Sequence, residues 1–284
     1  MKSVSGLFLA LLFCLLPLFD ATKAFAKDEL LDEILSRREL RVGVSPGFVP
    51  FVVDGEEARE LKSKVIGDLP IDSKTGVCGF DVELARAIAR SLEIRLTLIK
   101  AKDLYQLQEL LNQGEIDMAL SGLTRTLERA WSFYLSDPYF VSGLIILVPK
   151  NSPVRELKEL NNEKHELFVK LSSTSENFAR RYLPNANIAS FSSEEVMFEK
   201  LQESKTASIV IDAIKAQSYR MSDKLSSDFR RLEGRRFTDE YFGILLPRDY
   251  SLLHYVNLFI ESYKRSGKFH DLASRFNPWF RSED

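Results

Sequence analysis

The sequence predicts an α/β protein, and three observations support that class. Short apolar runs typical of buried strands alternate with segments that have the apolar spacing of helices, a pattern of parallel sheets covered by helices. The chain has 284 residues, which is enough for two domains of ordinary size. Hydroxyl-bearing and charged residues follow several predicted strands, at the edge where open α/β sheets bind ligands.

The segment 1–26 is predicted to be a secretory signal peptide that is removed from the fold. Lys2 precedes an apolar stretch over 6–19, and the small residues Ala24 and Ala26 have the spacing of a cleavage site. The apolar stretch is too short to span a bilayer comfortably. We therefore expect an exported protein, cleaved after about Ala26.

Charge and cysteine content exclude several classes of function. Removing residues 1–26 leaves 37 basic and 40 acidic residues, a net charge of −3. Such a chain has no strong positive field, so nucleic acid is not expected as a partner. Cys78 is then the single cysteine, so we expect no intrachain disulfide and interpret Cys78 as a small apolar residue. His165, His254 and His270 lack the spacing of a metal site, and no cofactor motif is present.

The first half of the chain reads as alternating helices and strands. Strands are expected at 40–44, 95–99 and 116–120, and helices at 28–38, from Phe80 onward, and from Leu104 to Gly114. A long charged loop is expected over 52–77. Asp81 is interpreted as the cap of the helix that starts near Phe80.

The second half has the same pattern. Strands are expected at 144–148, 167–171, 207–211 and 244–246, and helices from a capping box of Ser192 and Glu195 to Glu203, at 213–219, at 252–266, and up to Phe276. Crossings between two structural units are expected near 140–143 and 240–243.

The stretch 121–140 carries the strongest functional signal. Ser121, Gly122 and Thr124 follow a predicted buried strand and offer amides and hydroxyls to an anion. Thr126 is a predicted helix N-cap, and Arg129 in the first turn could grip both oxygens of a carboxylate. A cation there opposes the helix dipole by about 0.3–1 kcal/mol, which a bound anion would relieve. The alternative is that Arg129 is a solvated surface residue.

This stretch resembles the signature of the bacterial extracellular solute-binding proteins of family 3, periplasmic proteins that bind polar amino acids. The matching residues are Ser121, Gly122, Thr124, Thr126, Glu128, Arg129 and the run Ser136-Asp137-Pro138-Tyr139. The resemblance extends from about Leu40 to Trp279. It implies a two-lobe periplasmic binding protein fold of type II, in which each lobe is a mostly parallel sheet flanked by helices. The ligand cleft would lie between lobe 1, at 27–142 and 243–284, and lobe 2, at 143–242.

The resemblance also implies the roles of particular residues. Arg129 would hold a ligand carboxylate, Ser121, Gly122 and Thr124 would add hydrogen bonds, and Phe48 would form an apolar wall. The alternative for Phe48 is ordinary packing in the core.

Lobe 2 is expected to contribute two residues. Ser173 would reinforce the carboxylate site, although Ser172 replaces a glycine of the family pattern and would constrain the turn. Asp212 would receive the α-ammonium group, or cap the helix that follows it, and both roles could coexist.

The function implied is capture of a small amino-acid-like ligand by lobe closure and its delivery to the permease of an ABC transporter in the inner membrane. We expect a periplasmic monomer without catalytic residues, cofactor or metal. One alternative is an enzyme like cyclohexadienyl dehydratase, which acts on prephenate or arogenate with a carboxylic acid in the cleft. Another is a ligand-sensing module of a membrane receptor. Arg125 could favour an acidic ligand or face solvent.

Overall fold

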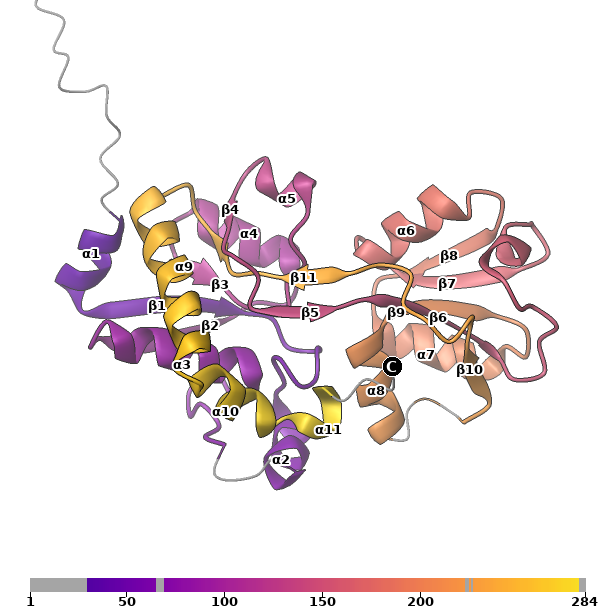
Figure 1. Ribbon diagram of the computed structural model, residues 1–284, viewed down its shortest axis with the longest axis horizontal. Helices are drawn as coiled ribbons and strands as arrows, with labels where there is room; N and C mark the ends of the chain where they lie inside the picture. Colours follow the sequence, from indigo (N-terminus) through magenta and orange to yellow (C-terminus); the bar gives the residue numbers. More distant parts are fainter. Residues whose placement is uncertain (1–29, 65–68, 223–224, 226, 281–284) are drawn as a thin grey trace, which may run out of the picture.

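The computed structural model describes residues 30–64, 69–222, 225 and 227–280 (Figure 1). The predicted signal peptide lies outside these residues. Within them the chain forms two five-stranded sheets, connected by an antiparallel ribbon of β5 (Phe140–Ser142) and β11 (Glu240–Phe242). The ribbon lies where the two crossings were expected. We propose that the lobes divide there, at the boundaries given above.

The sheet of lobe 1 has the strand order β2-β1-β3-β12-β4. Its strands are β1 (Glu39–Val44), β2 (Arg95–Lys100), β3 (Met118–Ala119), β4 (Tyr134–Leu135) and β12 (Leu245–Leu246). β1 pairs in parallel with β2 and β3, whereas β12 runs antiparallel to both of its neighbours. The last strand of the chain therefore lies inside the first sheet.

Helices flank this sheet (Figure 1). They are α1 (Leu30–Arg37), α2 (Gly55–Lys64), α3 (Phe80–Ser91), α4 (Leu104–Asn112), α5 (Leu127–Ala130), α9 (Tyr250–Arg265), α10 (Lys268–Ser274) and α11 (Asn277–Phe280). α2 lies in the segment that was expected to be a loop, and that expectation is wrong for 55–64. The helix is held because Ala58 and Leu61 are buried in the core of lobe 1.

The sheet of lobe 2 has the order β10-β6-β9-β7-β8. Its elements are β6 (Leu144–Pro149), the 3₁₀ helix η2 (Leu157–Leu160), β7 (Glu166–Lys170), α6 (Thr174–Tyr182), β8 (Asn187–Phe191), α7 (Glu194–Glu203), β9 (Ser208–Asp212), α8 (Ala213–Met221) and β10 (Phe229–Arg231). β6 runs antiparallel to β9 and β10, and β7 is parallel to β8 and β9. In both described sheets one strand opposes the others, so the predicted mostly parallel α/β architecture is confirmed.

Two predicted helix caps are wrong. The cap of α3 is Gly79 and not Asp81, whose carboxylate points to other partners described below. The cap of α7 is Ser193 and not Ser192, because the Ser193 hydroxyl accepts the N–H of Val196 at 3.3 Å. Both errors are small shifts along the chain, which is where local patterns are least informative.

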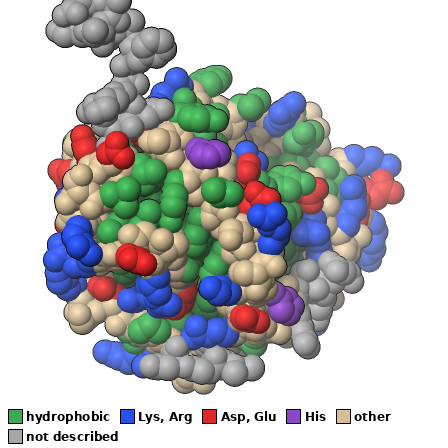
Figure 2. Space-filling view, turned by 60° about the vertical axis from the view of Figure 1, so that its left-hand side comes forward, with side chains coloured by type: hydrophobic (Ala, Val, Ile, Leu, Met, Phe, Trp, Pro, Cys, Tyr) green, Lys and Arg blue, Asp and Glu red, His purple; other side chains and the backbone are tan. Residues whose placement is uncertain are grey.

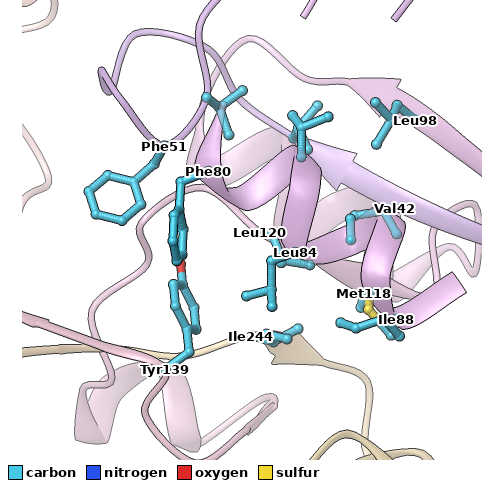
Figure 3. Packing of buried hydrophobic residues seen from close by; sticks show 14 of the residues in the cluster. Val42, Phe51, Phe80, Leu84, Ile88, Leu98, Met118, Leu120, Tyr139 and Ile244 are labelled. Atoms are coloured by element: carbon cyan, nitrogen blue, oxygen red, sulfur yellow. The ribbon is translucent and has the colours of Figure 1, made fainter. Parts of the chain in front are cut away.

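Aromatic side chains fill the part of the lobe 1 core that faces the ribbon. The rings of Phe80 and Tyr139 stack with centroids 6.3 Å apart, with Leu84 and Ile244 nearby (Figure 3). Phe51 lies 5.2 Å from the ring of Phe140 and 5.2 Å from that of Phe242. Such pairs contribute about 0.5–1.5 kcal/mol each beyond their buried area. They fix the loop after β1 against the ribbon.

Helix α8 belongs to lobe 2 but packs against lobe 1. Ile214 is part of the lobe 1 core, and α8 contacts α11. The Ser218 hydroxyl donates a hydrogen bond of 2.6 Å to the carbonyl of Val49. Helix α8 is thereby held beside the loop that carries Phe48.

The surface is mixed in character. Figure 2 shows one face of lobe 1, where apolar side chains gather among acidic and basic ones of both signs. No helix within the described part of the chain has the length and apolar character needed to cross a membrane.

Candidate functional site

One cleft of about 800 Å³ is lined by residues of both lobes. Its lining includes all seven predicted contact residues: Phe48, Ser121, Gly122, Thr124, Arg129, Ser173 and Asp212. The volume is within the range of small-molecule sites, about 300–1,000 Å³. The fold brings these residues together because most of them follow the carboxyl ends of strands, which meet at one edge of each sheet.

Arg129 lies on α5, a single helical turn. Thr126 caps this turn as predicted, since its hydroxyl accepts the N–H of Arg129 at 3.3 Å. The guanidinium Nη1 donates to the carbonyl of Thr124, which aims the half-buried side chain along the cleft. Burial lowers the pKa of Arg129, and Glu240 and Glu128 oppose that shift. A guanidinium remains charged in any such environment, so the cleft contains a permanent cation.

The loop after β3 is held by its own hydrogen bonds. The Ser121 hydroxyl accepts the N–H of Ser45 at 2.7 Å and lies 3.2 Å from the carbonyl of the same residue. The Gly122 amide donates to Asp81 at 2.6 Å. Two groups that were expected to face a ligand are therefore bonded within the protein. The amide of Thr124, by contrast, has no hydrogen-bond partner among the described residues.

Gly122 has a second role, which concerns Phe48. Its φ of +59° suits glycine, and a Cβ atom at this position would lie 2.7 Å from the Phe48 ring. Phe48 therefore lies directly over Gly122. Its ring packs edge to face with the ring of Phe51, with the two ring centres 4.9 Å apart. Since Phe48 is half-buried and also lines the cleft, it is both a packing residue and a wall of the site.

Asp81 is a fully buried carboxyl group behind this loop. Its Oδ2 accepts hydrogen bonds from the Gly122 amide and, at 3.0 Å, from the Tyr139 hydroxyl. Its Oδ1 has no partner among the described residues. Burial raises the pKa of Asp81 to about 7. No local pattern indicates this contact, because it joins positions 41 residues apart.

On lobe 2, Ser173 caps α6. Its hydroxyl donates to the carbonyl of Lys170 at 2.6 Å and accepts the N–H of Glu176 at 3.3 Å. To donate to a ligand carboxylate, the Ser173 hydroxyl would have to give up its hydrogen bond to the Lys170 carbonyl. Ser172 before it has a φ of +58°, so serine adopts the left-handed conformation for which the family pattern has glycine.

Asp212 caps α8, as one of its two predicted roles requires. Its Oδ1 accepts the amides of Ile214 at 2.9 Å and Lys215 at 3.2 Å. Burial raises the pKa of Asp212 to about 6. The Asp212 side chain also lines the cleft, so capping leaves it placed for a second role as acceptor of a cation.

Lys215 and Glu194 also line the cleft, and neither was predicted from the sequence as a site residue. The Lys215 ammonium lies 2.7 Å from Oε1 of Glu194 and 4.5 Å from the centre of the Phe48 ring. Oε2 of Glu194 accepts the Tyr219 hydroxyl at 3.2 Å. Lys215 lies three residues after Asp212, the N-cap of α8, and this short spacing was the available signal for Lys215.

Other candidate residues are placed away from this chemistry. Arg125 is exposed and is not part of the cleft lining, so it faces solvent. Cys78 is buried, and burial raises its pKa to about 11, which disfavours the reactive thiolate. In the described ranges no group of three or more His, Cys, Asp or Glu side chains is placed to hold a metal ion.

Comparison with known proteins identifies relatives with this architecture. Residues 70–280 match the sequence profile of the bacterial extracellular solute-binding proteins, family 3. The chain is 27% identical to the glutamine-binding protein of an ABC transporter from Bacillus subtilis over 208 residues, 72% of this chain and 73% of that protein. It is 26% identical to a cyclohexadienyl dehydratase from Pseudomonas aeruginosa over 257 residues, 89% of this chain and 87% of that enzyme.

A solved structure gives the same result for the fold. The crystal structure of an ancestral amino acid-binding protein, a precursor of cyclohexadienyl dehydratase, superposes with a TM-score of 0.71 at 28% identity. The alignment covers 88% of this chain and 99% of that one. The predicted two-lobe fold of type II is confirmed.

Proposed function

Because the chain belongs to the bacterial extracellular solute-binding proteins of family 3, we propose that it captures a small amino acid by closing its lobes on the cleft. It would act in the periplasm as a monomer and deliver the ligand to the permease of an ABC transporter. The relative from Bacillus subtilis, a glutamine-binding protein of such a transporter, supports this role.

The observation that carries the proposal is the pairing of charges in the cleft. Arg129 of lobe 1 and Asp212 of lobe 2 line one cavity with opposite charges. A zwitterion can satisfy both residues fully only when the lobes approach each other. The ligand then has a higher affinity for the closed form, which any ligand-driven shift of populations requires.

The remaining contacts follow from the hydrogen bonds described above. The Thr124 amide has no internal partner and would join Arg129 on the ligand carboxylate. The Ser173 hydroxyl, on the other lobe, would donate to the ligand carboxylate in place of its present hydrogen bond to the Lys170 carbonyl. Ser121 and Gly122 would act mainly by shaping the loop, because the Ser121 hydroxyl and Gly122 amide are bonded to Ser45 and Asp81.

Calorimetric titration of the protein without its signal segment against the common amino acids tests the proposal. At least one amino acid should bind, and ligand at 100 times its dissociation constant should stabilise the protein by about 2.7 kcal/mol. Arg129→Ala should lower the affinity for that ligand at least tens of fold, because removing one partner of a buried charge pair costs about 2–5 kcal/mol.

The matched control is Arg125→Ala, which removes an exposed arginine four residues before Arg129 and should leave binding unchanged. Binding by Arg129→Ala with wild-type affinity would show that the carboxylate is held elsewhere. Failure of every common amino acid to bind would refute the proposed ligand class.

A second candidate function is dehydration of prephenate or arogenate. It is favoured by Glu194, a buried carboxyl group in the cleft, and by the dehydratase relative. Incubation with either compound and spectroscopic detection of the aromatic product decides between the two. Turnover at enzyme-like rates that is lost in Glu194→Gln would show that the protein is an enzyme and not only a binding protein.

A further inference from the structure

We propose that Lys215 is a built-in cation that excludes amino acids with positively charged side chains and restricts the cleft to neutral or acidic ones. The inference rests on the proposed function, because it specifies which ligands the same cleft accepts.

Lys215 occupies the one buried glutamate of the cleft lining and one of its aromatic faces, two groups that a cationic side chain could use. Its ammonium lies 2.7 Å from Oε1 of Glu194 and 4.5 Å from the centre of the Phe48 ring. A carboxylate and an aromatic face are the two kinds of group that proteins use most directly to hold an ammonium or guanidinium. Both are already taken by a side chain of the protein.

The ion pair of Lys215 and Glu194 lies next to the groups that we propose to hold the carboxylate and ammonium of the ligand. Lys215 is in the first turn of α8, and its amide donates to Oδ1 of Asp212, the N-cap of this helix, at 3.2 Å. Phe48 lies over Gly122, in the loop whose carbonyl at Thr124 orients Arg129. A ligand held between Arg129 and Asp212 therefore directs its side chain into the neighbourhood of Lys215.

The charges of the cleft favour the same conclusion. The charged lining residues that are not exposed are Arg129, Lys170 and Lys215 on the positive side and Asp212 and Glu194 on the negative side. Among these less exposed groups the positive ones are in excess by one, whereas the exposed Lys102, Asp103 and Glu195 bring the whole lining to four charges of each sign. The Lys215 and Glu194 side chains are only 16% and 11% exposed, so a further cation would meet repulsion that water screens poorly.

The Lys215 contacts are also fixed from both lobes. Glu194 is held by the Tyr219 hydroxyl at 3.2 Å, and the neighbouring Ser218 of α8 bonds to Val49 of lobe 1 at 2.6 Å. An ammonium with these supports cannot leave its place without breaking the ion pair. It therefore acts as a steric and electrostatic barrier, and not as a mobile surface lysine.

The experiment compares wild type with Lys215→Met by calorimetric titration with arginine, lysine, glutamine and glutamate. Methionine keeps the length of the side chain and removes its charge. Wild type should bind arginine and lysine at least tens of fold more weakly than its best neutral or acidic ligand. Lys215→Met should gain about tenfold or more in affinity for arginine, because Glu194 and Phe48 become free to hold the guanidinium.

Three further variants make the test specific. Lys170→Met removes the other partly buried lysine of the cleft, whose Nζ bonds to the Ser192 carbonyl, and should give no gain for arginine. Adding Glu194→Gln to Lys215→Met should abolish the gain. Lys215→Gln serves as a second neutral variant if the methionine variant does not fold, as judged by its thermal unfolding.

Arginine or lysine as the tightest ligand of wild type would overturn the inference, as would neutral variants of Lys215 with unchanged affinity for arginine. Failure of the proposed function looks different, since wild type would then bind no amino acid at all. The variants still decide the inference in that case: a gain of arginine binding supports it, and no gain overturns it.

Discussion

At the scale of single residues, Asp81 connects the core of lobe 1 to the wall of the cleft. Its buried carboxylate holds the Gly122 amide and the Tyr139 hydroxyl, and the Phe48 ring rests on Gly122. The position of Phe48 thus depends on a residue that is not part of the cleft lining. An ionised carboxylate in this place lacks a cationic partner and is costly to bury.

This burial predicts how stability varies with pH. The folded-state pKa of Asp81, about 7, lies above the ordinary value of 3.8, so the folded protein binds this proton more tightly. The resulting stabilisation is complete below pH 4 and is lost as pH rises to about 7. Wild type should therefore lose a few kcal/mol in its free energy of unfolding over that pH interval, and Asp81→Asn should not show this loss. Urea unfolding at several pH values measures it.

The control for this prediction is Asp32→Asn, which changes an exposed aspartate on α1. It should keep the decline seen in wild type. Asp212, with a pKa raised to about 6, adds a smaller decline of the same sign that both variants retain. A wild-type slope in Asp81→Asn would mean that Asp81 does not titrate in this range.

At the scale of elements, the turn between β7 and α6 is under backbone strain. Ser172 adopts a φ of +58°, and its amide donates to Oε2 of Glu176 at 2.7 Å. A side chain in the left-handed region costs about 1–2 kcal/mol, part of which glycine would recover despite its larger entropy loss on folding. Ser172→Gly should therefore stabilise the protein by about 0.5–1 kcal/mol, measured from the denaturant midpoint.

Ser192→Gly provides the comparison, because Ser192 also follows a strand and lines the cleft but has no positive φ. It should be neutral or destabilising. A lower midpoint for Ser172→Gly than for wild type would contradict the strain at this turn.

The elements themselves could be predicted where apolar periodicity was strong. The strands at 40–44, 95–99 and 144–148 were located to within one or two residues. The strand expected at 116–120 is shorter, since only Met118–Ala119 pairs. Helix α2 was missed because most of its residues are polar, and the two that are buried, Ala58 and Leu61, are too few to define a period.

The candidate site was predictable to the extent that topology alone places it. Arg129 comes after β3 in the sheet of lobe 1, and Asp212 ends β9 in the sheet of lobe 2. Each therefore lies beyond the carboxyl ends of the parallel strands of its own sheet. The ion pair of Lys215 with Glu194 depends on how α7 and α8 pack, and the Asp81 contact depends on a loop distant in sequence. Neither follows from local pattern, because each requires the tertiary structure.

At the scale of the whole molecule, the ligand would be the link between the lobes. Wild type should bind the α-keto analogue of its amino acid at least tens of fold more weakly than the amino acid itself. Asp212→Asn should lower the affinity for the amino acid and reduce the difference in affinity between the two ligands. The double variant Arg129→Ala, Asp212→Asn should lose less binding free energy than the sum of the losses in the two single variants, because either change alone already prevents closure. Calorimetry gives the affinities, and small-angle scattering shows whether ligand still compacts each variant.

Strict additivity of the two substitutions would indicate that carboxylate and ammonium are bound independently, without closure. Equal affinity of wild type for the amino acid and its keto analogue would leave Asp212 with its helix-capping role alone.

The place of β12 in the first sheet affects the order in which the chain can fold during synthesis. β12 pairs with both β3 and β4, yet it follows the entire second sheet in sequence. The second sheet is complete once β10 has emerged, whereas the first still lacks an inner strand. A nascent chain usually folds its amino-terminal domain first, but here lobe 2 can form while lobe 1 remains incomplete. The first sheet thus stays incomplete until β12 has been made.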